Sequence, residues 1–361
     1  MLLDYWVYYF FLFWSAISWP ICINLGRGSY KKIYFVVNFF PLAFLAALRG
    51  DHVGADTQGY LMYFRQLADM EIEGWRTDIF ESGYVIYNKI CFSLGLDKYD
   101  MLFLISFVTV IGFGCFFYLY SSNLFVSTIV FMGMWFYLPI FTTTRQCFAT
   151  MIICNVFGYL CNSPIKFKNR IVAMLCIIFA GSFHSSVLVF LVFVILYPIN
   201  KKKFLFIVFV GIYGYLIFKD NGLLVLAEYA DYVSYAHYIG GKYDVSTEFG
   251  AQVIKAILCI ICGIWGVKVS KKLKGSEYNL CMLSSSLSML SAIYIFCGYE
   301  INIVNRMVYS SFIFVTILLP ILFNEIENSV VKYTFLIFGV LVYFTKSLSV
   351  VSYEDIHYYF R

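Results

Sequence analysis

The sequence predicts an all-α protein, a polytopic transmembrane helix bundle of about twelve spans with short amphipathic helices in its extracytoplasmic loops. Composition is the first reason. Of the 361 residues, 61% are hydrophobic and 13% are charged, whereas soluble domains carry about 25% charged residues. The mean hydropathy of +0.80 agrees with this. The second reason is that apolar runs suited to crossing a bilayer recur along the whole chain, which predicts one membrane domain over residues 1–361.

The apolar runs divide the chain into twelve predicted spans. The first has no basic segment before it and no small-residue cleavage site after it, so we expect a retained helix rather than a removed signal peptide. The sixth and seventh are short and could form a half-crossing pair instead, which returns the chain to the same side. The predicted spans cover residues 5–24, 33–48, 100–119, 124–140, 146–161, 171–183, 185–198, 204–218, 249–267, 279–298, 306–323 and 333–350.

Basic residues predict the orientation of the bundle. With twelve crossings, four basic clusters fall on one face, which the positive-inside rule makes cytoplasmic. Both termini and the two long loops, residues 49–99 and 219–248, then lie outside the cytoplasm, and we expect the chemistry there. The clusters are Arg27, Lys31 and Lys32; Lys166, Lys168 and Arg170; Lys201, Lys202 and Lys203; and Lys268, Lys271, Lys272 and Lys274.

Several function classes lack their sequence signature. The chain has no phosphate-binding glycine loop, no dinucleotide fingerprint and no basic, aromatic-interleaved stretch typical of nucleic-acid binding. Most of its eleven cysteines lie inside apolar runs, and we expect them to be buried packing residues rather than metal ligands or disulfides. A catalytic role outside the cytoplasm therefore needs no cofactor or metal that we can identify, but it does need a substrate that arrives already activated.

Residues 49–60 place ionisable groups at the outer end of the second predicted span: Arg49, Asp51, His52 and Asp56. Such groups are costly at a membrane boundary unless they are wetted, paired or used. Asp56-Thr57 can cap a helix on which Tyr60, Phe64 and Leu67 share a face. Asp56 is therefore either a helix cap or a chemical group, and Arg49 is either a helix-end anchor or a ligand. Glu81-Ser82 precedes a second short helix, whose apolar residues are Tyr84, Tyr87, Ile90, Cys91 and Leu94.

Two further arginines stand at predicted outer span ends. Arg145 follows three threonines and opens a long apolar run, and Arg306 follows Asn302 and Asn305 at the start of another. Guanidinium groups bind phosphate oxygens with two parallel hydrogen bonds. Interfacial anchoring would explain each arginine singly, but Arg49, Arg145 and Arg306 together favour an anionic ligand.

Two features of the outer face leave alternatives open. His184 lies in a small-residue segment between two short spans, where it is either a structural histidine or a proton-transfer group; His52 and His237 compete for the second role. Tyr229, Tyr232, Tyr235 and Tyr238 recur at every third position of the loop 219–248. They form either an interfacial aromatic belt or a platform for sugar rings.

Five short motifs occur in order along the chain. They are Arg49 with Val53-Gly54-Ala55-Asp56-Thr57 and Tyr60; Glu81-Ser82-Gly83-Tyr84; Arg145-Gln146 with Ala149; Phe183-His184-Ser185-Ser186; and Asn305-Arg306. The ordered set, between about residues 40 and 320, resembles the EpsG-type family, whose members are bacterial polysaccharide polymerases of the Wzy class. The loop 219–248 carries no motif of this family.

The resemblance implies a multi-pass glycosyltransferase of the bacterial inner (cytoplasmic) membrane, with an active site that faces the periplasm or exterior. Its substrates would be oligosaccharides attached to undecaprenyl pyrophosphate, and the growing chain would pass to the non-reducing end of a fresh repeat unit. The resemblance implies no cofactor and no metal. The partners are then the lipid-linked oligosaccharide, the bilayer and, as a further candidate, a chain-length regulator; nucleic acid is not among them.

For that chemistry we expect Arg49, Arg145 and Arg306 to hold the pyrophosphate as the glycosidic bond breaks. His184 or Asp56 would serve as the base for the acceptor hydroxyl, with His184 preferred. The expected substrate-binding residues are Glu81, which is also a third candidate base, Tyr60, Tyr232, Tyr235 and His237.

Three rival functions use similar features. A flippase for lipid-linked oligosaccharides would also bind an anionic lipid, but it should carry charged groups along a path through both leaflets. A ligase that moves finished polymer onto a lipid core would use the same donor. A membrane acyltransferase would explain His184 but not the arginines.

Overall fold

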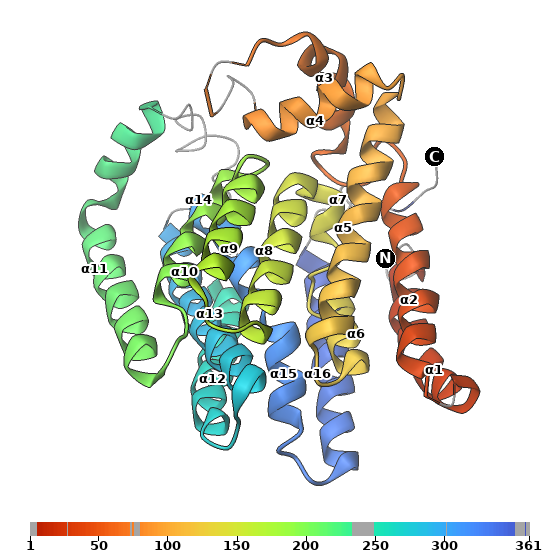
Figure 1. The fold of residues 1–361 in the computed structure, drawn as a ribbon, viewed down its shortest axis with the longest axis vertical. Coiled ribbons are helices and arrows are strands. Elements are labelled where there is room, and N and C mark those ends of the chain that lie inside the picture. Colours follow the sequence, from red (N-terminus) through yellow and green to blue (C-terminus); the bar gives the residue numbers. More distant parts are fainter. Residues whose placement is uncertain are drawn as a thin grey trace. The chain divides into compact units, whose positions relative to one another are not determined.

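The chain folds into helices, as the computed structural model shows (Figure 1), and no strand occurs among the residues that the structure describes. Those residues are 6–26, 28–72, 74–75, 80–232, 249–300, 302–350 and 358; for 217–232, 249–252, 298–300, 302–306, 335, 342 and 344–350 the description covers the backbone alone. The helices are α1 Trp6–Gly26, α2 Tyr30–Ala47, α3 Thr57–Asp69, α4 Ser82–Ser93, α5 Lys98–Tyr120, α6 Leu124–Gly133, α7 Pro139–Thr142, α8 Thr144–Asn162, α9 Phe167–Gly181, the 3₁₀ helix η2 Ser185–Phe190, α10 Leu191–Leu196, α11 Lys201–Tyr232, α12 Phe249–Ser270, α13 Gly275–Glu300, α14 Asn302–Phe312, α15 Val315–Phe323 and α16 Ser329–Val350.

Five helices among the described residues are long and apolar enough to cross a membrane: Trp6–Gly26, Tyr30–Ala47, Lys98–Tyr120, Val253–Ser270 and Gly275–Cys297. Four other apolar stretches are shorter, Leu124–Gly133, Ser185–Leu196, Met307–Phe323 and Ser329–Leu341. The all-helical class is confirmed, whereas the expected twelve spans are not.

Several predicted spans are broken where the backbone cannot continue a helix. The run 124–140 forms α6 and the short α7, because Trp135 adopts a positive φ of 66° and Pro139 starts a new turn. The run 306–323 divides between α14 and α15. The break expected between residues 183 and 185 is present between α9 and η2.

The chain divides into two compact units, and the first comprises Met1–Tyr159, Ile171–Phe190 and Ile326–Arg361. Its core is aromatic: Phe39 of α2 and Phe117 of α5 contact Phe131 of α6 with ring centroids 5.2–6.4 Å apart. Buried polar groups join α1 to α2, where the Tyr34 hydroxyl donates to the Ser15 carbonyl at 2.9 Å. Helix α5 of this core also packs against α3 and α4.

The second unit comprises Leu160–Arg170 and Leu191–Glu325. Helix α13 is its centre and packs against α11, α12, α14 and α15. Small residues allow the close approach of α12 and α13, because a Cβ at Gly266 would lie 2.0 Å from the Ser285 Oγ. The Ser288 hydroxyl donates to the Cys259 carbonyl at 2.9 Å, so this contact between the two helices also satisfies a buried polar group.

The cysteines are packing residues, as expected. None of the eleven forms a disulfide, and eight of them are buried. Within the described part of the chain, no group of three or more histidine, cysteine or acidic residues is placed to hold a metal ion.

The loop 49–99 folds into the two short helices that the sequence predicts, α3 and α4 (Figure 1). Tyr60, Phe64 and Leu67 are buried on one face of α3, as their spacing indicates. The buried face of α4 includes Tyr84, Val85, Asn88 and Cys91, whereas Ile90 is exposed, as is Leu94 directly after the helix.

Candidate functional site

Arg49 is fully buried, with 1% of its surface exposed, immediately after α2. Four oxygens accept hydrogen bonds from its guanidinium. Nε donates to the Thr57 hydroxyl at 3.1 Å, Nη1 donates to the Ala46 carbonyl and the Ser106 hydroxyl at 2.8 Å each, and Nη2 donates to the Thr144 hydroxyl at 2.9 Å. Burial lowers the pKa of Arg49 to about 10, which leaves it protonated at neutral pH. Arg49 therefore ties α2, α3, α5 and the first residue of α8 together.

The turn before α3 fits closely against α7. Gly54 has a φ of +93°, and a Cβ at this position would lie 1.9 Å from the Phe141 carbonyl oxygen. The Thr57 hydroxyl contacts the same carbonyl at 3.2 Å. Only glycine adopts this conformation at such a close approach without strain. The turn is therefore fixed against the helices that carry the rest of the site.

Asp56 stands at the N-cap position of α3, but its side chain makes no capping hydrogen bond. Of the two alternatives for Asp56, the side-chain helix cap is therefore not present, and the residue is exposed. It lies close enough to Tyr60 to raise the pKa of that phenol, after the larger effect of burial.

Arg145 lies in the first turn of α8, inside a cage of three aromatic rings. Its Cζ is 4.3 Å from the ring centroid of Phe80, 5.4 Å from that of Tyr84 and 6.0 Å from that of Tyr60. Aromatic faces attract a cation at these distances. The cage comes from α3 (Tyr60), the segment before α4 (Phe80) and α4 itself (Tyr84), and it holds the guanidinium at the start of α8.

One donor of Arg145 has no partner in the described structure. Nη1 donates to the Glu81 Oε2 at 2.5 Å, but the buried Nε makes no hydrogen bond. Burial lowers the pKa of Arg145, while Tyr60, Glu81 and Tyr84 raise it by more. The residue is therefore a fixed cation with an unused N–H, and its side chain is 17% exposed.

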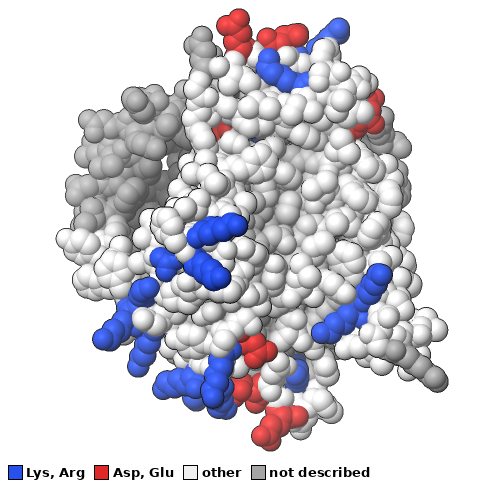
Figure 2. All heavy atoms as spheres, viewed as in Figure 1, with Lys and Arg blue, Asp and Glu red and all other residues white. Residues whose placement is uncertain are grey.

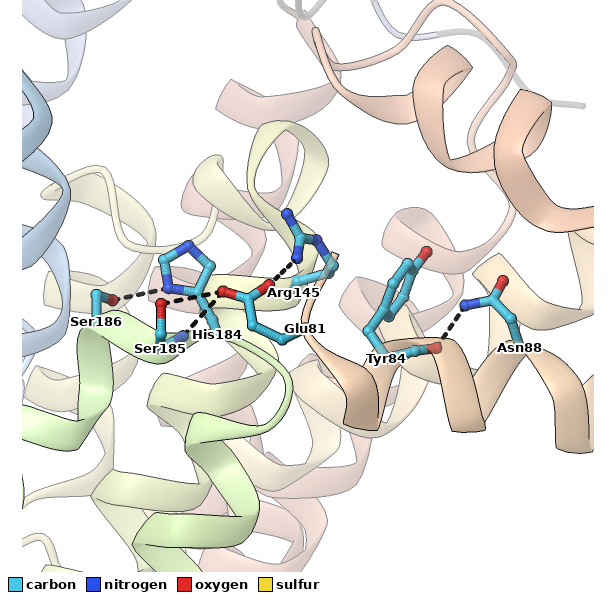
Figure 3. Close-up of polar contacts among 7 residues, drawn as sticks. All are labelled: Glu81, Tyr84, Asn88, Arg145, His184, Ser185 and Ser186. Atoms are coloured by element: carbon cyan, nitrogen blue, oxygen red, sulfur yellow. Dashed lines mark hydrogen bonds and ion pairs between the residues drawn. The ribbon is translucent and has the colours of Figure 1, made fainter. Parts of the chain in front are cut away.

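Glu81 is the centre of the cluster in Figure 3. Its side chain is 3% exposed. Oε2 pairs with Arg145, and Oε1 accepts hydrogen bonds from the Ser185 backbone N–H at 3.0 Å and the Ser185 hydroxyl at 3.1 Å. Burial raises the pKa of Glu81, but the charges of Arg145 and His184 and the Ser185 N–H outweigh burial, so the pKa lies well below its usual range. The carboxylate is therefore ionised at neutral pH, and its lowered pKa makes it a weak base while Arg145 holds it.

His184 lies in the turn between α9 and η2, next to this carboxylate (Figure 3). Its Nδ1 is 2.7 Å from the Ser186 hydroxyl. The turn is held against the start of α4 by a hydrogen bond from the Gly83 N–H to the Ser182 carbonyl at 2.9 Å. A Cβ at Gly83 would lie 2.7 Å from that carbonyl oxygen. The imidazole is half-buried, so it is supported by the protein and still reaches solvent.

The structure thus brings together Glu81, Arg145, His184 and Tyr60, which are far apart in sequence but all belong to the first unit. Arg49 is joined to them through Thr144, the residue before Arg145. For four other expected site residues the structure describes no side chain. Arg306 lies in α14 of the second unit and Tyr232 ends α11, with the backbone alone described for both, and Tyr235 and His237 lie outside the described residues.

Sequence reasoning missed several members of the site. Phe80 and Tyr84 provide two walls of the cage around Arg145, and Ser185 joins Glu81 to the His184 turn. Tyr84 and Ser185 belong to motifs noted in the sequence, and Phe80 directly precedes one. Their adjacency to Glu81 and His184 was the available signal, but it does not reveal which side chain each one contacts.

The described residues of the cluster could hold an anion at Arg145, where the buried Nε is unused, and could accept a proton at the imidazole of His184. In comparisons with known proteins, the model of one family, described as the EpsG family, matches residues 32–360. No curated protein and no solved structure gives a significant match.

Proposed function

The chain belongs to the EpsG family of polysaccharide polymerases, and from this premise we propose that it is a membrane glycosyltransferase that lengthens a glycan carried on undecaprenyl pyrophosphate. Its several apolar helices make it a membrane protein. In this proposal the growing glycan leaves its lipid carrier and is transferred to the non-reducing end of a lipid-linked repeat unit.

The observation that carries the proposal is the unused donor of Arg145. A guanidinium held by a carboxylate and an aromatic cage is already oriented, and its Nε–H has no hydrogen-bond partner to exchange for a phosphate oxygen. Because this Nε is buried, the proposal requires the bound lipid pyrophosphate to open a path to it. The leaving group of the reaction is a pyrophosphate, whose negative charge grows as the bond to the sugar breaks. A preorganised cation stabilises that growing charge more than the ground state.

The proposed transfer breaks the bond between the anomeric carbon of the donor sugar and the pyrophosphate oxygen. The acceptor hydroxyl oxygen forms the new bond to that carbon, and its proton passes to His184. Undecaprenyl pyrophosphate leaves against Arg145. Glu81, being ionised and engaged, positions both groups rather than accepting the proton. Asp56 is the second candidate base.

Arg49 takes a different role in this proposal from the one its sequence suggests. Its donors already contact four protein oxygens, and it is shielded from solvent. We propose that Arg49 positions the start of α8, and so Arg145, instead of touching the phosphate. Arg306 remains a proposed phosphate ligand, and Tyr232, Tyr235 and His237 remain proposed sugar contacts.

We propose the twelve-span topology with the site on the outer face of the inner membrane. Within the second unit, the three basic clusters around Arg170, Lys203 and Lys272 lie at one end. Two contacts of this end are the hydrogen bond from the Arg170 Nη2 to the Tyr197 carbonyl at 2.8 Å and the ion pair of Lys272 with Glu325. The Asn279 amide contacts the Cys161 carbonyl at 3.4 Å. Helix α13 begins at this basic end, directly after Lys274, and α14 begins after the opposite end of α13, which supports an outer location for Arg306.

The test is to analyse lipid-linked glycans in a deletion strain complemented with the Arg145→Ala variant. A polymerase defect leaves single repeat units on the lipid carrier at the outer face. Loss of a flippase would keep the units inside, and loss of a ligase would leave long chains on the carrier; either pattern overturns the proposal. The matched control is Arg65→Ala, because Arg65 is an exposed arginine of α3 outside the cluster.

A further inference from the structure

One end of the second unit is strongly basic. The segments 160–170, 191–203, 268–279 and 320–325 contain ten lysines and arginines against two acidic residues. The contacts of Arg170 with Tyr197, of Asn279 with Cys161 and of Lys272 with Glu325 join these segments into one surface. Figure 2 shows lysines and arginines gathered there. We call the exposed lysines Lys166, Lys168, Lys201, Lys202, Lys268, Lys271 and Lys274 the basic end.

The fold engages three cations of these segments and leaves the basic end unengaged. The Lys203 Nζ donates to the Leu196 carbonyl at 2.6 Å and the Pro198 carbonyl at 3.0 Å, and Arg170 bonds the carbonyl between them. Lys272 pairs with Glu325. No side chain of the basic end makes a hydrogen bond or ion pair with a residue that the structure describes. Seven lysines of these segments thus make no ion pair within the described chain, and Glu277 is the one acidic residue of the four segments that the Lys272–Glu325 pair leaves over.

The exposed apolar side chains of the same unit indicate how deep these lysines lie in a bilayer. On α12, Ile261 and Ile264 are more than half exposed, and Lys268 follows Ile264 by four residues, or about 6 Å of helix rise. On α11, Leu205 is more than half exposed, and Lys202 precedes it by three residues, or about 4.5 Å. The headgroup layer on each side of a bilayer is about 5–7 Å thick. Lys268 and Lys202 therefore stand at headgroup depth when these apolar side chains lie in hydrocarbon.

The segment before α9 has the pattern of an interfacial anchor. Ile165 is 56% exposed and Phe167 is 79% exposed, and they alternate with Lys166 and Lys168. If the partner were an acidic protein, the lysines alone would be enough to complement its charge. Two large apolar side chains between them favour a partner that offers negative charge and a hydrocarbon boundary in the same place.

We propose that the basic end is a binding surface for anionic phospholipids. The lysines contact the phosphodiester groups, and Ile165 and Phe167 enter the boundary between headgroups and acyl chains. Each lysine near an anionic surface contributes about a fivefold preference for the charged lipid. This inference does not depend on the reaction that the first unit performs, because all of its residues belong to the second unit.

The experiment reconstitutes the full chain in bilayers of phosphatidylcholine with a spin-labelled probe lipid, either phosphatidylglycerol or phosphatidylcholine. Electron paramagnetic resonance then measures the association of each probe with the protein. We expect wild-type protein to prefer phosphatidylglycerol, and the preference to fall by at least fivefold in the Lys166→Gln/Lys168→Gln variant. High salt should reduce the preference. The Arg65→Gln variant should keep it, because Arg65 belongs to the other unit.

Two further variants separate charge from apolar anchoring. Lys166→Arg/Lys168→Arg keeps the charge and should keep the preference, whereas Phe167→Ser should weaken association of both probes. Equal association of the two probes with the wild type, or an unchanged preference in the glutamine variant, overturns the proposal. Binding of soluble poly-glutamate in place of the charged lipid would also overturn it, since the surface would then serve a protein. The thermal unfolding temperature of each variant, measured in the same bilayers, checks that it is folded.

Discussion

The Glu81 carboxylate and the Arg145 guanidinium form an ion pair across 64 residues of sequence, with 2.5 Å between Oε2 and Nη1. The second carboxylate oxygen of Glu81 holds Ser185, the neighbour of His184. One ionised side chain therefore sets the positions of the proposed phosphate ligand and the proposed base. The site depends on Glu81 for its geometry, although we propose that Glu81 takes no part in the bond-breaking step.

The Glu81→Gln variant should be less stable by about 3 kcal/mol, because it leaves the buried Arg145 cation without its counter-charge. Thermal unfolding of the purified protein in detergent measures the change. Glu325→Gln is the matched control, since its partner Lys272 is 70% exposed and such a surface pair contributes at most about 1 kcal/mol. Equal losses in the two variants would contradict the buried pair.

The pH dependence of stability should follow from the lowered pKa of Glu81. A carboxylate with a lowered folded-state pKa stabilises the fold above its unfolded pKa, about 4.3 for glutamate, and loses this contribution as pH falls through the folded-state pKa. The stability difference between the wild type and Glu81→Gln should therefore be constant from pH 8 to pH 5 and narrow only below about pH 4. Unfolding temperatures measured across this range would contradict the assignment if the difference halved between pH 7 and pH 5.

The sequence predicts much of this site through local patterns. Apolar spacing predicts the buried face of α3, and the ordered short motifs single out Glu81, Arg145 and His184. These inferences succeed because a helix face and a short motif are properties of neighbouring residues. Asp56 shows the limit of this reasoning. The residue stands at the N-cap position of α3, but the sequence could not decide between a cap and another role, and the side chain makes no capping hydrogen bond.

The partners of each side chain could not be predicted, because they depend on long-range packing. Arg49 contacts Ser106 and Thr144, residues that carry no signal of that pairing. The aromatic cage around Arg145 needs α3 and the segment before α4 to meet the first turn of α8. The run 124–140 was predicted as one span because its composition is apolar throughout, whereas the positive φ at Trp135 ends the helix early.

Arg49→Lys should reduce the amount of folded protein in the membrane more than it reduces the activity of each remaining molecule. A lysine has a single ammonium group in place of the planar guanidinium, so it cannot donate to Thr57, Ser106 and Thr144 at once. The loss should be about 3 kcal/mol, because buried acceptors remain without a donor. Thr144→Val, which removes one acceptor, should cost about 1 kcal/mol. Quantitative immunoblotting with a polymerisation assay separates abundance from activity.

Arg145→Lys should reduce the activity of each molecule more than it reduces the amount of folded protein, the reverse of Arg49→Lys. The lysine keeps a positive charge beside Glu81 and in the aromatic cage, so folded protein should remain near wild-type abundance. It lacks the unused Nε donor, so chain lengthening should fall by about a hundredfold, the effect of losing one preorganised donor. If Arg49→Lys and Arg145→Lys lost abundance and activity in the same proportion, the division of roles between the two arginines would be wrong.

Gly83→Ala should displace the turn that carries His184. The new methyl group would lie 2.7 Å from the Ser182 carbonyl oxygen, a backbone atom that cannot move without its turn. We expect a rate loss of at least tenfold, with the unfolding temperature lowered as well. Gly59→Ala in α3 is the matched control, because no atom lies within 4 Å of its added methyl group. That substitution should be neutral or stabilise the helix by up to about 1 kcal/mol. Similar activity in the two variants would show that the turn does not need its close contact with α4.

The last prediction concerns the base itself. His184→Gln should lower the rate of chain lengthening by between about a hundredfold and ten-thousandfold, the usual contribution of a general base, without changing folded abundance. Ser186→Ala keeps the imidazole but removes the hydroxyl 2.7 Å from its Nδ1. It should therefore cause a smaller loss and shift the pH at which the rate is half-maximal, a change that a purely structural role for Ser186 would not produce. Asp56→Asn, measured in the same pH series, distinguishes the two candidate bases. If Asp56→Asn abolishes the reaction while His184→Gln remains active, the proton passes to the exposed carboxylate at the start of α3 rather than to His184.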